Sequence, residues 1–109
     1  LYLLRHAQSA EKQIGQQDKD RVLTPDGMKD ASYIGQYMQQ HAHMPDVMIS
    51  SAAERTRETS FIIADALKLE HDKIIFEDEL YEASTRTFLG VINQIDNSYN
   101  TALCVGHNP

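Results

Sequence analysis

The sequence predicts an α/β fold with three layers, in which helices cover both faces of a mostly parallel sheet. Four short apolar runs have the length of buried strands, and they span residues 1–4, 47–49, 74–76 and 101–105. Between these runs, apolar residues recur at helical spacing. Regular alternation of strands and helices is typical of βαβ units, whose strands run parallel beneath their crossover helices.

The first half of the chain is predicted to contain one strand, one loop and one helix. Residues 1–4 are apolar throughout, which is typical of a central parallel strand buried on both faces. Residues 8–23 are polar and rich in glutamine, without a helical or strand period, so we expect a loop that leads away from this strand. Thr24 suits a helix N-cap and Pro25 the first helical position, and the helical pattern fades near His41.

The second half repeats the strand and helix pattern. After the second strand, the residues from Ser51 to Glu54 have the form of a capping box, which predicts that a helix begins there and runs through Leu67. Another helix is predicted from Ser84, between the third and fourth strands.

The composition is that of one ordinary globular domain. The 109 residues are 41% hydrophobic and 24% charged, and their formal net charge of −6 argues against nonspecific binding to nucleic acid. No apolar run approaches the roughly 18 residues that span a bilayer, and we find no signal-peptide pattern. The single cysteine, Cys104, fits a reducing compartment, so we expect a cytoplasmic protein with no membrane partner.

The ends of the chain bear on its domain boundaries. The chain begins without methionine and stops after Asn108 and Pro109, a pair that usually opens a turn. We therefore expect a single domain over residues 1–109 that lacks its C-terminal portion.

Reactive side chains follow the predicted strands at the point where each strand ends. Arg5 and His6 follow the first strand, and Arg55 lies in the first turn of the helix after the second. Glu82 follows the third strand after a short turn, and His107 follows the fourth. Because ligands of open α/β sheets bind outside the carboxyl ends of the strands, we expect these side chains to form one site.

The residue types in this set suit a phosphoryl group. A guanidinium presents a fork of donors that matches phosphate oxygens, and the first turn of a helix favours anions. Nearby arginines disfavour the cationic form of a histidine, which leaves a ring nitrogen free to act as a nucleophile. Glu82 could donate a proton to the leaving group. The set has no metal-ligand pattern, and the chain has no nucleotide-binding loop, so we expect no metal and no cofactor.

Four segments of the chain resemble signature segments of one enzyme superfamily. Residues 3–7, LLRHA, are similar to an RHG or RHA motif, and residues 21–27, RVLTPDG, resemble an R-x-L-T-x-x-G stretch. Residues 51–59, SAAERTRET, are similar to S-P-x-x-R-x-x-Q-T, and residues 105–109 match V-G-H-N-P. The chain therefore resembles the histidine phosphatase superfamily, which has a phosphoglycerate mutase-like fold, and most closely its SixA branch of phosphohistidine phosphatases.

The resemblance implies a role for each matching residue. His6 would be the nucleophile that becomes phosphorylated. Arg5, Arg55 and His107 would bind the phosphoryl group, and Arg21 would add to the same pocket.

Three other positions need comment against the superfamily pattern. The superfamily needs no metal. Glu82 lies where mutase-like members carry a proton-donating glutamate. Ala52 replaces the usual proline, and Glu58 replaces a glutamine. We expect Glu58 to pair with Arg57 or to point to solvent.

The sequence thus favours a metal-independent phosphohydrolase that acts through a phosphohistidine intermediate on His6. The substrate implied by the resemblance is a phosphohistidine on a signalling protein, such as a phosphotransfer domain. Two alternatives stay open. One is a phosphatase or mutase of the same superfamily that acts on a small phosphate ester, and the other is a non-catalytic module that binds phosphoproteins.

Overall fold

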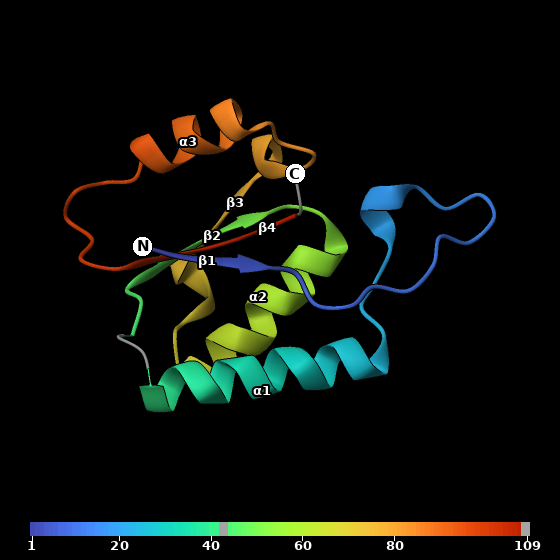
Figure 1. Ribbon diagram of the computed structural model, residues 1–109, viewed down its shortest axis with the longest axis horizontal. Helices are drawn as coiled ribbons and strands as arrows, with labels where there is room; N and C mark the ends of the chain where they lie inside the picture. Colours follow the sequence, from blue (N-terminus) through green and yellow to red (C-terminus); the bar gives the residue numbers. More distant parts are fainter. Residues whose placement is uncertain (42–43, 108–109) are drawn as a thin grey trace.

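Four parallel strands form the central layer of the computed structural model, which describes residues 1–41 and 44–107 (Figure 1). The strands are β1 (Tyr2–Arg5), β2 (Val47–Ser51), β3 (Ile74–Glu77) and β4 (Ala102–Gly106). Their order across the sheet is β1-β4-β2-β3, and each neighbouring pair is parallel. All four carboxyl ends therefore lie along one edge, as the alternating pattern predicts.

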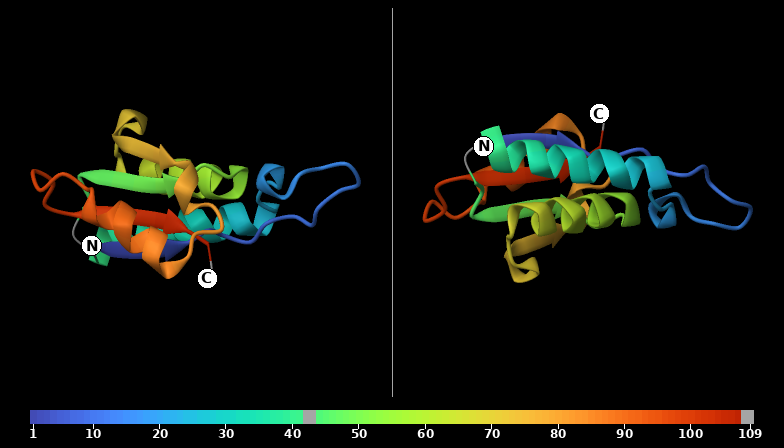
Figure 2. Two further views of the ribbon diagram at one scale, coloured as in Figure 1. Left: turned by 90° about the horizontal axis from the view of Figure 1, so that it is seen from above. Right: turned by 90° about the horizontal axis from the view of Figure 1, so that it is seen from below.

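Helices cover both faces of this sheet. Helices α1 (Pro25–His41) and α2 (Glu54–Leu67) pack side by side on one face, and α3 (Thr85–Asn93) lies on the other (Figures 1 and 2). Short 3-10 turns are η1 (Asp18–Asp20), η2 (His71–Lys73) and η3 (Asp78–Leu80). The predicted three-layer α/β/α class is confirmed. Within the described ranges, no helix combines the length and the apolar character that crossing a membrane requires.

Helix starts agree with the sequence in two cases and differ in the third. The Gly27 N–H donates to Thr24 Oγ1 at 2.9 Å ahead of α1, and Ser84 accepts the Thr87 N–H at the start of α3. The predicted capping box at α2 is wrong. Ser51 still belongs to β2, and Ala53 occupies the N-cap position without a side-chain cap.

The position of β1 corrects another expectation. It is an edge strand of the described sheet, whereas β2 and β4 are central and almost wholly buried. Tyr2 and Leu4 pack against the core, but Leu3 on the opposite face is 63% exposed. An apolar run reports apolar neighbours and does not specify which strands pair on each side, so the prediction of a central strand was wrong.

Two apolar clusters fasten the sheet to its helices. Met48 and Leu103 pack with Ile63 of α2 on one side, while Ile49 and Cys104 pack with Val91 of α3 on the other. Burial of such side chains contributes roughly 1.5–3 kcal/mol each. The two central strands are therefore held firmly from both faces, which steadies the edge that carries the site.

The loop of residues 8–23 extends beyond the sheet and then returns to it (Figure 2). Ser9 and Leu23 form an antiparallel bridge that closes its base. The Leu23 N–H donates to Glu58 Oε1 at 3.2 Å, so Glu58 holds the loop against α2. Both alternatives expected for Glu58 were wrong, because it is partly buried in this contact and Arg57 pairs with Glu54. At Gly27, an added Cβ would lie 2.2 Å from the Gln8 carbonyl oxygen, so the loop base and α1 approach as closely as a glycine allows.

Candidate active site

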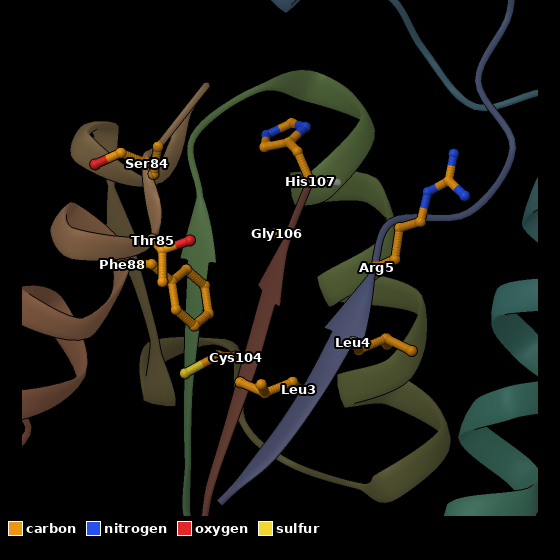
Figure 3. Close-up of a pocket in the computed structure, with 10 residues that line it drawn as sticks. Leu3, Leu4, Arg5, Ser84, Thr85, Phe88, Cys104, Gly106 and His107 are labelled. Carbon is orange, nitrogen blue, oxygen red and sulfur yellow. The ribbon is translucent and has the colours of Figure 1, made fainter. Parts of the chain in front are cut away.

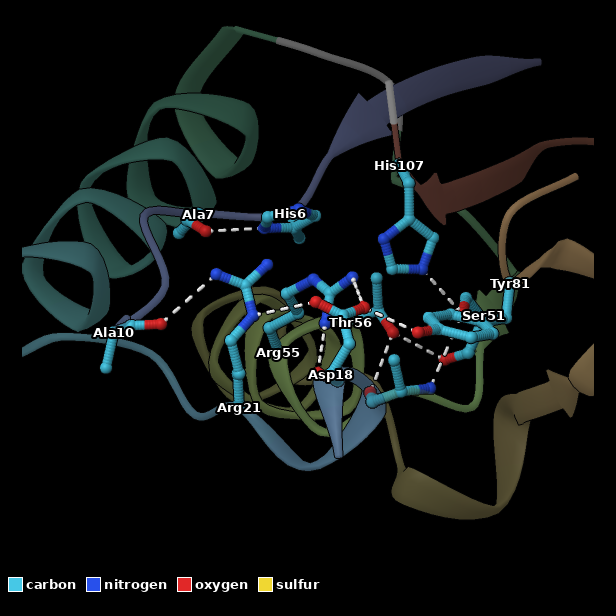
Figure 4. A network of polar contacts seen from close by, with 11 residues as sticks. His6, Ala7, Ala10, Asp18, Arg21, Ser51, Arg55, Thr56, Tyr81 and His107 are labelled. Atoms are coloured by element: carbon cyan, nitrogen blue, oxygen red, sulfur yellow. Dashed lines mark hydrogen bonds and ion pairs between the residues drawn. The ribbon is translucent and has the colours of Figure 1, made fainter. Parts of the chain in front are cut away.

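The pairing of β1 with β4 brings two histidines together. Arg5 lies opposite Gly106 in the register, and the His6 N–H donates to the Gly106 carbonyl at 3.0 Å. His6 and His107 thus leave adjacent strand ends, with ring centroids 5.2 Å apart in an edge-on arrangement (Figure 4). The parallel register alone is sufficient to make them neighbours.

His6 is neutral and presents one free ring nitrogen. Its Nδ1 lies 2.6 Å from the Ala7 carbonyl oxygen, which can only accept, so Nδ1 carries the proton and Nε2 keeps its lone pair. Burial lowers the pKa of His6, and the cations Arg55, Arg5 and Arg21 act in the same direction against the Ala7 hydrogen bond. The lone pair at Nε2 is therefore available at neutral pH.

His107 is held through its Nε2 atom, whereas His6 is held through Nδ1. Its Nε2 lies 2.8 Å from Ser51 Oγ, which also accepts the Ala53 N–H at 3.4 Å. Burial, followed by the Arg55 charge, lowers the pKa of His107 to about 4, so this ring is neutral as well. When the Ser51 hydroxyl donates to Nε2, the proton of the ring lies on Nδ1, which is buried without a hydrogen-bond partner in the described chain.

Arg55 lies beneath the two histidines in Figure 4 and is only 5% exposed. It is the second residue of α2, where the helix dipole is positive. Its Nη1 donates to the Asp18 carbonyl at 2.9 Å, and its Nη2 lies 3.0 Å from Asp18 Oδ2. Its Nε is buried and finds no partner among the residues described.

Asp18 joins Arg55 to two further side chains. Arg21 Nε lies 2.9 Å from Asp18 Oδ1, and the Tyr81 hydroxyl donates to Asp18 Oδ2. These hydrogen bonds, Tyr81 foremost and then Arg55, lower the pKa of Asp18 to about 2 despite partial burial. Asp18 therefore carries a full negative charge at neutral pH, and it raises the pKa of Tyr81.

The unpartnered donors indicate an anion. A buried donor without a partner costs about 1–3 kcal/mol, and more when the group is charged. Here the Nε of Arg55 and the Nδ1 of His107 are both in that condition. An oxyanion between them would satisfy both donors and would lie next to His6. The site can thus hold a tetrahedral anion beside a neutral imidazole.

The structure brings together four of the six predicted site residues: His6, His107, Arg55 and Arg21. The Arg5 side chain is exposed and forms no hydrogen bond or ion pair with the residues that the structure describes, although its charge helps to lower the pKa of His6. Glu82 is also exposed, with a φ of 54°, and has no such bond within residues 1–41 and 44–107. Roles for Arg5 and Glu82 stay predictions. Asn108 and Pro109 of the V-G-H-N-P segment lie outside the described residues.

An apolar groove of about 280 Å³ adjoins the site (Figure 3). Leu3, Phe88 and Cys104 line its floor and wall, and Arg5 and His107 stand at its end. Within the described ranges, no group of three histidine, cysteine or acidic side chains is arranged to hold a metal ion.

Four side chains support the site without having been predicted to do so: Ser51, Thr59, Asp18 and Tyr81. Ser51 and Thr59 fall inside the segment that resembles S-P-x-x-R-x-x-Q-T, and Thr59 accepts the Ala7 N–H at 3.1 Å, which holds the backbone beside His6. The resemblance of that segment to the motif was a signal from which Ser51 and Thr59 could have been predicted. Asp18 precedes Arg21 by three residues, but nothing local indicates that it reaches Arg55 or Tyr81.

Comparison with known sequences identifies relatives of the chain. The sequence model of the Histidine phosphatase superfamily (branch 1) matches residues 1–107. An uncharacterized protein of Mycobacterium tuberculosis is 32% identical over 110 residues, which cover 97% of this chain and 63% of that protein. An uncharacterized chloroplastic protein of Arabidopsis thaliana is 41% identical over 59 residues, covering 54% of this chain and 27% of its own length. The chain thus spans less than two thirds of the length of these curated relatives.

Solved structures give the same family. The candidate phosphohistidine phosphatase SixA of Agrobacterium tumefaciens superposes with a TM-score of 0.90 at 34% identity, over 99% of this chain and 68% of that one. Its counterpart from Nakamurella multipartitia superposes with a TM-score of 0.83 at 33% identity, over 98% and 59%. A SixA protein histidine phosphatase in complex with tungstate shares the fold, with a TM-score of 0.85 at 18% identity over 98% of this chain and 68% of that one.

Proposed function

Because this chain belongs to the histidine phosphatase superfamily, we propose that it is a phosphohydrolase that works through a phosphohistidine intermediate on His6. One observation carries the proposal. The neutral His6 keeps its Nε2 lone pair while its Nδ1 is bound to the Ala7 carbonyl, directly beside the unpartnered donors of Arg55 and His107.

The reaction proceeds in two displacements. The Nε2 lone pair of His6 attacks phosphorus, and an N–P bond forms as the bond from phosphorus to the leaving atom breaks. The leaving atom keeps the electron pair and takes a proton. Water then attacks the phosphohistidine, gives up a proton to the group that donated one before, and releases orthophosphate as the N–P bond breaks. Glu82 is the predicted donor, and it adjoins Tyr81, whose ring contacts His107.

The residues around His6 lower the barriers without a metal in this proposal. Phosphoryl transfer spreads negative charge over three equatorial oxygens, and donors fixed at those oxygens stabilise the transition state. Arg55 supplies its Nε, His107 its Nδ1, and Arg21 and Arg5 add positive charge. Both histidines stay neutral beside these cations, so His6 remains reactive and His107 remains a donor.

The proposed substrate is a phosphohistidine on a protein partner in the cytoplasm, such as a phosphotransfer domain. The 33–34% identity to two candidate phosphohistidine phosphatases supports this choice. Phosphohydrolase action on a small phosphate ester is the alternative that the apolar groove beside His107 favours, because the groove could take an organic leaving group.

The test measures phosphate release from a phosphohistidine-bearing protein domain, a phosphoserine peptide and a small aryl phosphate. We expect release from the first substrate, and a loss on the order of 10³-fold or more in His6→Ala, because the nucleophile is gone. His41→Ala, at the exposed end of α1, is the matched control and should keep wild-type activity. Quenching with an alkaline denaturant should trap a phosphate that is stable to base and labile to acid on the wild-type and His41→Ala chains, and not on His6→Ala.

Three results would count against the proposal in different ways. Full activity in His6→Ala would disprove the mechanism. Release from the aryl phosphate alone would move the substrate to small esters. Tight binding of the phosphorylated domain without release from any substrate would favour a binding module.

A further inference from the structure

Asp18 ties three segments together at the centre of the candidate site. Its carboxylate accepts hydrogen bonds from Arg55 Nη2 and the Tyr81 hydroxyl and forms an ion pair with Arg21, whose Nε lies 2.9 Å from Oδ1, and its backbone carbonyl accepts a hydrogen bond from Arg55 Nη1. These partners come from α2, from the end of the 8–23 loop and from the turn after η3. None of the roles assigned above uses Asp18.

The contacts divide the Arg55 guanidinium into two edges. The edge formed by Nη1 and Nη2 is occupied by the carbonyl and the carboxylate of Asp18. The edge that contains Nε is buried and unpartnered in the described part of the chain. A guanidinium is planar and its donors form a rigid fork, so fixing one edge fixes the direction of the other.

We propose that Asp18 is a positioning residue, which holds Arg55 so that its Nε edge faces the phosphoryl group and which offsets part of the positive charge of the arginines. This inference rests on the proposed phosphohydrolase function and deepens it. Arg55 would otherwise be a single buried cation on a flexible stem, free to turn any of its five donors to an incoming anion. Asp18 selects the orientation in advance, which is a contribution to turnover more than to binding.

A different role, in which Asp18 blocks the site by competing for Arg55, fits the contacts less well. Two donors of Arg55 go to one residue through both its main chain and its side chain, which is an anchor and not a loosely held counterion. The same carboxylate is also occupied by Arg21 and Tyr81. Its removal would therefore disorder Arg55 and not simply uncover it.

The test compares Asp18→Asn with Asp20→Asn. Asparagine keeps the size and one acceptor oxygen of Asp18 but loses its charge. Asp20 is exposed in the same 3-10 turn, and its side chain has no bond to the site, so its variant controls for a charge lost from the loop. Both variants are measured for kcat, KM, the Kd of inorganic phosphate and the thermal unfolding midpoint.

We expect Asp18→Asn to lower kcat roughly 10- to 100-fold, the scale of a misplaced catalytic group. The affinity for inorganic phosphate should stay the same or rise, because a negative charge has left an anion site. Asp20→Asn should match the wild type in kcat and in its affinity for inorganic phosphate. A residue that only anchors the loop would instead reduce kcat, phosphate affinity and the unfolding midpoint together, and that pattern would overturn the proposal. Wild-type or raised kcat in Asp18→Asn would overturn it too.

A spectroscopic readout separates this inference from the proposed function. The Nε–H resonance of Arg55, assigned by its loss in Arg55→Lys, should be a single sharp signal that moves on adding inorganic phosphate. In Asp18→Asn it should broaden or shift before phosphate is added. If the wild type releases no phosphate from any substrate, the proposed function fails. The inference about Asp18 then stands or falls on whether this resonance changes in the variant.

Discussion

The candidate site draws on two regions that are built in different ways. His6 and His107 leave the ends of two paired strands, where backbone hydrogen bonds set their separation. Asp18 and Arg21 come from the 8–23 loop, which reaches the site after an excursion beyond the sheet (Figure 4). The first pair would be neighbours in any chain with this strand order. The second pair depends on a few contacts at the base of the loop.

The strand ends carry the groups that react or bind the phosphoryl group, and the 8–23 loop carries the groups that orient Arg55 and adjust the charge around it. The strand ends supply the free Nε2 of His6 and the donor ring of His107, on elements packed from both faces. The loop supplies charge and orientation to Arg55, and its base is held by the Ser9 to Leu23 bridge and by Glu58. Changes at the sheet edge should therefore abolish chemistry, whereas changes at the loop base should weaken it through stability and orientation.

The largest effect is expected at Arg55, where the two regions meet. Arg55→Lys keeps the positive charge but loses the planar fork, because its donors all leave one nitrogen and cannot reproduce two bonds to Asp18 together with the fixed direction of Nε. Loss of one such fixed donor costs about 10²–10³ in kcat, or about 2.7–4 kcal/mol. Steady-state kinetics on the phosphohistidine-bearing domain would measure the loss of kcat in Arg55→Lys.

Arg57→Lys is the matched control for that substitution. Arg57 lies two residues further along α2 and stacks over Phe76, with 4.5 Å from its Cζ to the ring centroid, away from the site network. Its variant should keep kcat within about twofold. Equal kinetics in the Arg55 and Arg57 variants would mean that the guanidinium geometry of Arg55 has no part in turnover.

A smaller effect, on stability, is expected at the base of the loop. In Gly27→Ala, the new methyl group would lie 2.2 Å from the Gln8 carbonyl oxygen, so the loop base or α1 must move. Such overpacking lowers the free energy of unfolding by about 1–3 kcal/mol. Urea unfolding of the wild type and the variant would show it as a lower midpoint.

Gly90→Ala is the control, because nothing lies within 4 Å of the Cβ that it adds in α3. Alanine in a helix is favoured over glycine by about 0.8–1.0 kcal/mol, so this variant should unfold at a higher urea concentration. If Gly27→Ala were as stable as the wild type, the loop base and α1 would not be in the close contact that leaves no room for a methyl group.

The same division explains what the sequence could predict. Periodicity predicted the order of strands and helices and the three layers. Parallel topology predicted the sheet edge at which His6, Arg55 and His107 meet, and the structure shows all of these features. Asp18 was not predicted, because its partners lie 37 and 63 residues away and a polar loop has no period that reports such contacts.

Two errors have equally physical causes. The apolar run of β1 was taken for a central strand, although side-chain character does not reveal how many neighbours a strand has. Ser51 was assigned to a capping box because serine suits that position, but its hydroxyl lies against His107 Nε2 and α2 begins later. In both cases tertiary contacts outweighed a local preference.

The smallest effect, taken per pH unit, is a dependence of stability on pH that arises from the strand-end histidines. Burial and Arg55 lower the folded pKa of His107 to about 4, against an unfolded value of about 6.5. Between these values the unfolded chain binds a proton that the folded chain does not, so the free energy of unfolding rises with pH. The contribution of His107 is complete above pH 6.5 and is lost as the pH falls towards 4. The pKa of His6 is lowered too, so it adds in the same direction.

His107→Gln isolates this term, because glutamine keeps a polar side chain but does not titrate. Urea unfolding at several pH values between 7.5 and 4.5 should give a shallower slope in the variant than in the wild type. The difference should stay below about 1.4 kcal/mol per pH unit, the limit for a single proton. His41→Gln, a change at the exposed end of α1, is the matched control for the loss of a histidine away from the site. Identical slopes in all three proteins would mean that His107 is not buried beside Arg55, and the close meeting of the two strand ends with α2 would have to be abandoned.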